Sequence, residues 1–552
     1  MLIKSRRLLL TLLITFCFAW VSRADSKRFR CMWRTDPATS MVVGWDQESG
    51  DNPVLFYDVI DFGSNVDAYR NQRRPDRIIL SRGMNNHFVR LSGLQPNTVY
   101  YFIVKDNRSV SQRYSFKTAP NTPNERLSII AGGDSRNNRE ARRDANQLVS
   151  KLRPHCVVFD GDMTGGDTAP EWREWFDDWQ ETIGSDGRIF PIIPAWGNHE
   201  RENSSITELF DVISSDVYYA LTLGGNLFRI YTLNTLIAPG ESQRIWLEGD
   251  LRASSNVIWK MAQYHQAMRP HTRAKPEQDE LWLHWAPLFH KYGVNVVMES
   301  DAHVVKTTYP IRPDNGPGSD EGFIRDDKTG SVYIGEGCWG APLRDNNDNK
   351  SWTRASGRFN QFKWIFVDRE KIEIRTIQTD MAYQVGEVSH NNIFEPPIGL
   401  NIWHPPTGDV VTITNNSSTP PGSRPQVGGP LAQNDRETSR PAPPPPASHN
   451  VSSIPREPEP AASDPSDWSP FPKVVPNETG DITIKYYLPQ NCDVTIQLIN
   501  PGWQPVAKMD FPRQPRGDQV KSLNLSRVPP GRYLLVIKGG DRLARRFQVL
   551  VR

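Results

Sequence analysis

Seven side chains able to bind metals or transfer protons follow short apolar runs in the middle of this 552-residue chain. Carboxylate, amide and imidazole groups together suit ions such as Zn, Mn or Fe. A carboxylate that bridges two ions would make a two-metal site, which stabilises the attacking and leaving oxygens of an in-line phosphoryl displacement. The seven residues are Asp134, Asp162, Asn198, His199, His265, Asp301 and His303.

The order of the surrounding segments indicates that these residues converge. Apolar runs at 129–131 and 157–159 flank a polar-faced helix at 140–153, and a helix at 277–292 precedes a strand at 294–298. This alternation predicts βαβ units and a parallel sheet. Strand carboxyl ends share one edge of such a sheet, where ligands bind. A single Gly-Asp is usually a turn and a single His is usually structural, so the prediction rests on their joint order.

The chain divides into segments of different composition. Residues 29–118 alternate short strands with turn signals, which predicts a β-sandwich of fibronectin type III style. Residues 417–472 contain 15 of the 45 prolines and predict an extended, disordered linker. Alternating runs at 482–487, 494–499 and 533–537 predict a second small β-sandwich. We therefore expect a multidomain chain with domains at 25–120, 121–400 and 473–552 and the linker at 417–472.

The start of the chain is typical of a secretory signal. Lys4, Arg6 and Arg7 precede the apolar stretch 8–21, and Ser22-Arg23-Ala24 predicts cleavage before Asp25. The alternative is an uncleaved membrane anchor. We expect residues 1–24 to be removed and the protein to be secreted, periplasmic or on the surface of a bacterium. With 65 Lys and Arg against 63 Asp and Glu, no nucleic-acid partner is expected.

The middle domain resembles the calcineurin-like metallophosphoesterases. With the domain before it, the chain resembles the purple acid phosphatases over about residues 29–378. This resemblance implies a central α/β sandwich of four layers behind the N-terminal β-sandwich. The motifs that carry it are Gly133-Asp134, Gly161-Asp162, Gly197-Asn198-His199-Glu200, Gln243 with Trp246-Leu247-Glu248, and the segments around His265 and His303.

The resemblance also implies a role for each site residue. Asp134, Asp162 and His303 would hold one metal ion, and Asp162 would bridge to a second ion held with Asn198 and His265. His199 would contact the scissile phosphate and protonate the leaving oxygen. The two ions would come from Fe, Mn, Zn or Mg, and the substrate would be a small-molecule phosphate ester.

The chain departs from the family pattern at two ligand positions. The metal-bound tyrosine of the family, whose charge transfer to ferric iron gives the purple colour, is replaced by Gly165. The usual Gly-His-x-His reads Ser300-Asp301-Ala302-His303, so Asp301 replaces a metal-binding histidine. A carboxylate is a harder ligand than imidazole, which favours Mn, Mg or Fe over Zn.

Two further residues are candidates for substrate binding. Arg136 could bind phosphate through two parallel hydrogen bonds, or it could be a surface ion-pair residue. His271, six residues after His265, could touch substrate or be a solvated loop histidine. The aromatic residues Trp172, Trp175 and Trp179 recur at helical spacing, which favours a packing stripe over a substrate wall.

The C-terminal domain resembles β-sandwich modules at the ends of some exported bacterial proteins, including sorting domains. We expect a contact with the cell surface or the secretion machinery, with a passive surface module as the alternative. The sequence as a whole predicts an exported phosphatase that hydrolyses phosphate monoesters by a two-metal-activated water. The alternatives are a phosphodiesterase on the same scaffold and a metal-poor pseudoenzyme that serves as a surface-binding protein.

Overall fold

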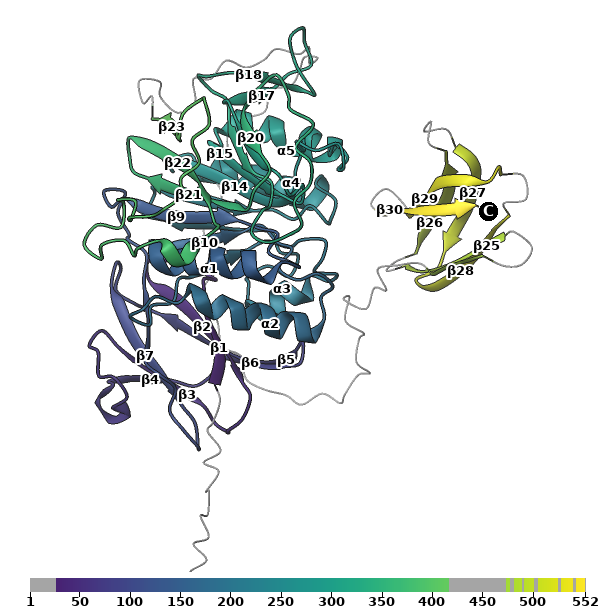
Figure 1. Ribbon diagram of the computed structural model, residues 1–552. Helices are drawn as coiled ribbons and strands as arrows, with labels where there is room; N and C mark the ends of the chain where they lie inside the picture. Colours follow the sequence, from purple (N-terminus) through teal and green to yellow (C-terminus); the bar gives the residue numbers. More distant parts are fainter. Residues whose placement is uncertain are drawn as a thin grey trace, which may run out of the picture. The chain divides into compact units, whose positions relative to one another are not determined.

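The computed structural model describes residues 26–415, 473–476, 481–488, 491–500, 505–524, 528–539 and 543–551 (Figure 1). The predicted signal peptide and the predicted linker lie outside these residues. The chain forms two compact units, Met1–Gly429 and Pro430–Arg552, which are described separately. Within the described ranges, no helix is both long and apolar enough to span a bilayer.

The first domain is a pair of sheets that share an aromatic core. One sheet has the order β4-β3-β7-β8, and the strands β1, β2, β6 and β5 lie next to one another in the other. Phe29, Trp45, Phe102 and Phe116 are fully buried between them. The strands are β1 (Ser26–Met32), β2 (Ser40–Gln47), β3 (Val54–Asp58), β4 (Asn71–Arg73), β5 (Arg77–Ser81), β6 (Met84–Ser92), β7 (Val99–Lys105) and β8 (Tyr114–Lys117).

The strands of the first domain continue the first sheet of the middle domain. That sheet has ten strands in the order β23-β22-β21-β9-β10-β11-β1-β2-β6-β5, and Met32 of β1 pairs in parallel with Ile192 of β11. Strands β9, β10 and β11 are parallel, as the βαβ pattern predicts. The middle-domain strands are β9 (Leu127–Gly132), β10 (Cys156–Phe159), β11 (Ile192–Pro194), β21 (Gln361–Val367), β22 (Lys371–Gln378) and β23 (Val410–Thr414).

A second sheet of seven strands packs against the first. Its order is β12-β13-β14-β15-β19-β16-β20, with β13, β14, β15 and β19 parallel. A separate hairpin joins β17 (Ile311–Pro313) to β18 (Phe323–Arg325). The strands are β12 (Tyr219–Leu223), β13 (Phe228–Thr232), β14 (Trp259–Gln266), β15 (Val296–Ser300), β16 (Val305–Thr308), β19 (Val332–Gly335) and β20 (Thr353–Gly357).

Helices cover the outer faces of the two sheets, which completes the four layers that the family resemblance implies. Because side chains alternate along a strand, Met261 of β14 joins the core between the sheets, whereas Ala262 packs with Leu247 and Trp285 of α4 and α5. Figure 1 shows α1 and α2 below strands β9 and β10 of the first sheet. The helices are α1 (Arg139–Leu152), α2 (Ala169–Trp179), α3 (Ser204–Leu209), α4 (Glu241–Ala253) and α5 (Asp279–Tyr292).

Local sequence explains where the helices near the site begin. Thr168 and Glu171 form a capping box at the start of α2, and Asn138 caps α1. The three tryptophans of α2 are buried, so the packing stripe is confirmed. The predicted boundary at residue 400 is too early, because β23 pairs with β22 and extends the sheet to Thr414. Residues 379–409, which connect β22 to β23, show neither helical nor strand periodicity, so no sequence pattern indicated that the domain continues to β23.

The second unit contains seven described strands in two sheets, with the orders β24-β25-β28 and β27-β26-β29-β30. Ile484 from the first sheet packs with Val494, Ile496 and Leu498 from the second. The strands are β24 (Lys473–Pro476), β25 (Asp481–Leu488), β26 (Cys492–Ile499), β27 (Pro505–Gln514), β28 (Gly517–Asn524), β29 (Gly531–Gly539) and β30 (Leu543–Val551).

One buried carboxylate fastens the first domain to the middle domain. Asp211, just after α3, is fully buried and pairs with Arg34, Arg77 and Arg90 of the first domain. Arg90 contributes two hydrogen bonds to it, of 2.7 and 2.8 Å. Removing the charge would leave three guanidinium groups without this shared partner.

Asp211→Asn should therefore lower the free energy of unfolding by about 2–4 kcal/mol, since breaking a buried ion pair leaves uncompensated charge. Asp327→Asn is the matched control, because Asp327 forms an exposed pair with Arg325, and it should change stability by less than about 0.5 kcal/mol. Urea denaturation followed by tryptophan fluorescence measures both. Equal stability of the two variants would contradict the proposed fastening role.

Candidate metal centre

The strand ends bring the predicted ligands of the middle domain together. Asp134 and Asp162 follow the adjacent strands β9 and β10 of the first sheet, and Asn198 follows β11. His265 lies in β14 of the second sheet, and Asp301 directly follows the neighbouring β15. The pairing of β14 with β15 is irregular between Gln263 and Gln266, which places His265 in a bulge.

Four of these residues have left-handed backbone conformations. The φ angles are 58° at Asp134, 55° at Asp162, 65° at Asp301 and 55° at His303. Such conformations cost about 1–3 kcal/mol each and persist only where surrounding contacts enforce them. Here the Asp301 N–H donates to Asp134 Oδ2 at 2.8 Å, and the His303 N–H donates to the Glu336 carbonyl at 2.7 Å. Backbone strain is thus concentrated where the side chains must converge.

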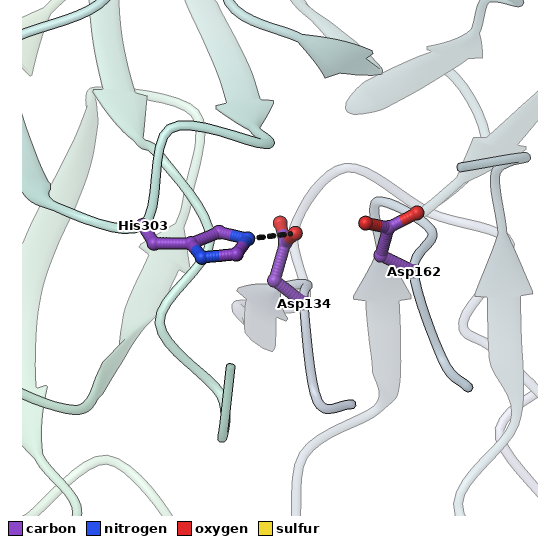
Figure 2. Close-up of side chains that lie close together, drawn as sticks. All are labelled: Asp134, Asp162 and His303. Atoms are coloured by element: carbon purple, nitrogen blue, oxygen red, sulfur yellow. Dashed lines mark hydrogen bonds and ion pairs between the residues drawn. The ribbon is translucent and has the colours of Figure 1, made fainter. Parts of the chain in front are cut away.

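The first ligand set consists of Asp134, Asp162 and His303, whose donor atoms lie within 4.8 Å of one another. Figure 2 shows the two carboxylates side by side, with the His303 ring approaching Asp134. His303 Nδ1 donates to the Pro342 carbonyl at 2.8 Å, which directs Nε2 into the site, 2.9 Å from Asp134 Oδ1. Asp162 Oδ2 is buried without a hydrogen-bond partner among the described residues. A cation at this position would satisfy that oxygen.

The second ligand set consists of Asp162, His265 and Asp301. His265 Nδ1 donates to the Asp160 carbonyl at 2.9 Å, which fixes the orientation of the ring. Its Nε2 lies 3.3 Å from Asp162 Oδ1 and 3.6 Å from Asp301 Oδ1. The side-chain oxygen of Asn198 is 3.1 Å from the same nitrogen. Asp162 therefore belongs to both sets, as a bridging ligand must.

Burial and neighbouring charges shift the pKa values of His265 and Asp162 in opposite directions. Burial lowers the pKa of His265, but the carboxylates of Asp162, Asp134 and Asp301 outweigh it and raise that pKa well above its ordinary value. Burial raises the pKa of Asp162, but the charge of His265 and the His199 ring holds it below its usual range. The cluster is thus a concentrated negative site that attracts cations.

Glu200 positions the two loops that carry Asp162 and Asn198, a role that the sequence did not predict. Its buried carboxylate accepts the N–H groups of Asp162 at 2.9 Å, Met163 at 2.6 Å and Gly197 at 3.0 Å. Burial and then the charge of Asp162 raise the pKa of Glu200 to about 8. Gly197 has no space for a side chain, because a Cβ would lie 2.2 Å from the Asp162 nitrogen.

His199 lies at the open side of the cluster, with 30% of its side chain exposed. Its Nδ1 donates to the Gly165 carbonyl at 2.6 Å, and its backbone N–H donates to Asp162 Oδ1 at 2.8 Å. These two bonds fix the ring so that Nε2 faces Asp162 Oδ2 at 3.8 Å. The geometry suits a group that holds a proton beside the reacting atoms.

The two candidate substrate residues have different surroundings. Arg136 lies against the first ligand set, with Nε 3.3 Å from Asp162 Oδ2 and Nη2 3.4 Å from His303 Nε2. His271 is fully buried, with its ring between Thr353 and Glu336. The expected contact of His271 with substrate is therefore not supported, and neither is the alternative of a solvated loop. Its sequence distance from His265 carried no information on the direction of its ring.

Two cationic residues that the sequence did not predict contact the site. Lys275 Nζ lies 2.5 Å from Asp301 Oδ1, and Arg344 Nη1 donates to the Asp301 carbonyl at 2.6 Å. Both lie in loops without a motif, so no signal in the sequence pointed to them. A third cluster of carboxylates surrounds Lys350, whose ammonium group pairs with all three of them. Its members are Glu277, Glu321 and Asp348.

Glu200→Gln keeps the size of the side chain but places an amide N–H₂ against backbone donors. We expect about 10–100-fold weaker metal binding, as for other losses of a group that orients ligands. Metal titration followed by calorimetry measures the change. The control is Glu202→Gln, an exposed residue of the same loop, and metal affinity equal in both variants would contradict the positioning role of Glu200.

Two protein-family models match the first and the middle domain of this chain. The model for the purple acid phosphatase N-terminal domain matches residues 27–118, and the model for calcineurin-like phosphoesterases matches residues 132–305. Purple acid phosphatase 13 of Arabidopsis thaliana is 25% identical over 313 residues, covering 46% of this chain and 54% of that protein. An uncharacterised protein of Mycobacterium tuberculosis is 22% identical over 325 residues, covering 50% of this chain and 60% of its own length.

A solved structure has a similar fold over most of the chain. The purple acid phosphatase PPD1 from yellow lupin (Lupinus luteus) seeds superposes with a TM-score of 0.56 at 15% identity, covering 71% of this chain and 74% of that one. At this identity the likeness concerns the fold. The model for calcineurin-like phosphoesterases covers the segments that carry the predicted ligands from Asp134 to His303.

Proposed function

This chain is a purple acid phosphatase-like member of the calcineurin-like phosphoesterases, and we propose that it is a metal-dependent phosphatase that hydrolyses phosphate monoesters at a two-metal centre. The observation that carries the proposal is the position of Asp162, which takes part in two ligand sets at once. The chemistry of the donors, carboxylate, amide and imidazole, fits two ions from Fe, Mn, Zn or Mg.

Each residue of the centre has a distinct task in this proposal. Asp162 would bind both ions, and Asp134 and His303 would complete the ligands of one of them. His265, Asn198 and Asp301 would complete the ligands of the other. The ions would supply Lewis-acid activation of the attacking water and of the phosphoryl group. His199 Nε2 would hold the proton that the leaving oxygen takes up.

Two alternatives remain on the same scaffold. A phosphodiesterase would use the same ligands, but its site would favour an ester with one negative charge over an ester with two. A metal-poor pseudoenzyme would require damage to the ligand sets. In both sets the ligand atoms lie within 4.8 Å of one another, and this favours a functional metal centre. Export, supported by the pattern of residues 1–24, and a surface contact of the C-terminal unit are further parts of the proposal.

Asp162→Asn and His199→Ala test the separate tasks of ligand and proton donor. Asp162→Asn should abolish hydrolysis of p-nitrophenyl phosphate and remove most bound metal, because one carboxylate serves both sets. His199→Ala should keep its metal and lose about 10²–10⁴-fold in turnover. Metal analysis and steady-state kinetics on both variants check this. Two retained ions and near-normal turnover in Asp162→Asn would overturn the bridging assignment.

The purified protein should be colourless or pale even when it contains iron, because Gly165 offers no phenolate. A Cβ at this position would already lie 3.1 Å from Glu171 Oε1. Tyr264, beside His265, is buried with its hydroxyl donating to Glu299 at 2.7 Å, on the side opposite the His265 ring. A visible spectrum with the metals counted is the test. An intense absorption band from a tyrosinate–iron pair would show that another tyrosine binds the metal.

A further inference from the structure

Three cationic side chains from three different loops contact the ligand residues. We call Arg136, Lys275 and Arg344 the cation trio. Arg136 lies 3.3 Å from the shared carboxylate of Asp162, whereas Lys275 and Arg344 reach the side chain and the backbone carbonyl of Asp301 at 2.5 and 2.6 Å. The cation trio therefore extends across both ligand sets.

The cation trio lacks carboxylate partners of its own. Among the ion pairs of the described residues, Arg136 and Lys275 pair only with ligand carboxylates, and Arg344 pairs with none. Neighbouring cations differ: Arg269 pairs with Asp279, and Lys306 pairs with Glu299 and Glu336. A half-buried cation normally has a counter-charge. The carboxylates beside Arg136 and Lys275 are those that would also bind the metal ions, so with the ions bound the trio would need a further negative charge.

The charges of the site would not balance once two metal ions were bound. The three ligand carboxylates of Asp134, Asp162 and Asp301 do not fully neutralise two divalent ions, and the cation trio then adds three positive charges. Among the described residues no other carboxylate pairs with the trio, so a site that held two divalent ions would carry excess positive charge, which a bound anion would neutralise. At neutral pH a phosphate monoester is largely a dianion, since its second pKa is near 6, whereas a diester carries one negative charge.

The exposure of these side chains suits contact with a substrate. The side chains of Arg136 and Lys275 are 12% and 23% exposed, so they are open to a ligand but only weakly screened by water. Guanidinium groups bind phosphate oxygens in pairs through their planar array of N–H donors, and an ammonium group acts as a point charge.

We infer that the cation trio selects the charge of the substrate: it binds the non-bridging oxygens of a dianionic phosphate monoester and disfavours a monoanionic diester. This inference rests on the proposed phosphatase function and assigns its substrate preference to residues that lie outside the metal-ligand sets. Lys275 and Arg344 would act as specificity determinants, and the trio would also hold inorganic phosphate, the dianionic product.

The test compares Lys275→Met and Arg344→Met with the wild type. The control is Lys291→Met, because Lys291 is exposed and pairs with Glu248 on the outer helix layer. For each protein kcat/KM is measured with p-nitrophenyl phosphate and with bis(p-nitrophenyl) phosphate. Calorimetry with inorganic phosphate and metal analysis provide readouts that do not depend on turnover.

Each trio variant should lose about 10–100-fold in the monoester-to-diester ratio and a similar factor in phosphate affinity, as expected for a lost charge-assisted hydrogen bond. Metal content should stay at the wild-type value, and the control should match the wild type. Lys275→Arg keeps the charge and should restore most of the ratio, which separates a charge effect from damage to folding.

Three outcomes would overturn the inference. The ratio and the phosphate affinity could both stay unchanged in the variants, or Lys275→Met could lose a metal ion, or Lys275→Arg could behave like Lys275→Met. Failure of the proposed function would look different, because the wild type would then hydrolyse neither ester. Phosphate calorimetry would still decide the role of the trio in that case, since equal phosphate affinity in wild type and variants would reject it.

Discussion

The metal centre depends on one buried carboxylate that binds no metal. Glu200 accepts backbone N–H groups from the Asp162 loop and from the loop of Gly197, Asn198 and His199. Without this shared acceptor, several buried donors would lose their partner at a cost of about 1–3 kcal/mol each. The same contacts hold Asp162 in its left-handed conformation, so the bridging position follows from how Glu200 is placed.

The first domain supports this arrangement from outside. Arg82 donates to both oxygens of Asp167, at 3.1 and 2.8 Å, and Ser205 also donates to Asp167 at 2.7 Å. Asp167 lies two residues after Gly165, whose carbonyl fixes the ring of His199. Arg82 of the first domain thus holds the loop between Asp162, the proposed bridging ligand, and α2. The Gly165 carbonyl in this loop orients the ring of His199, the proposed proton donor.

Sequence reasoning located the ligands because their positions follow a general rule. Parallel strands share one edge, so Asp134 and Asp162, which follow the adjacent strands β9 and β10, could be expected together before their distances were known. Asp301 follows β15 of the second sheet, so the expectation of a single parallel sheet was wrong, and Asp301 reaches the other two because the two sheets pack against each other. The direction of a side chain in a loop follows no such rule, which is why neither expected position of His271 matches its burial and why Lys275 was missed. The merging of two domains into one sheet depends on a short parallel contact between β1 and β11, which leaves no pattern in the sequence.

We propose that phosphoester hydrolysis depends on two ions that Asp162 would hold in common. The most direct measurement is the number of metal ions per chain, taken with the hydrolysis of p-nitrophenyl phosphate before chelation, after chelation and after metal is restored. The account predicts about two ions per chain, activity that disappears with them and activity that returns on reconstitution. Full hydrolysis by the chelated, metal-free protein, or full activity with a single ion, would contradict it.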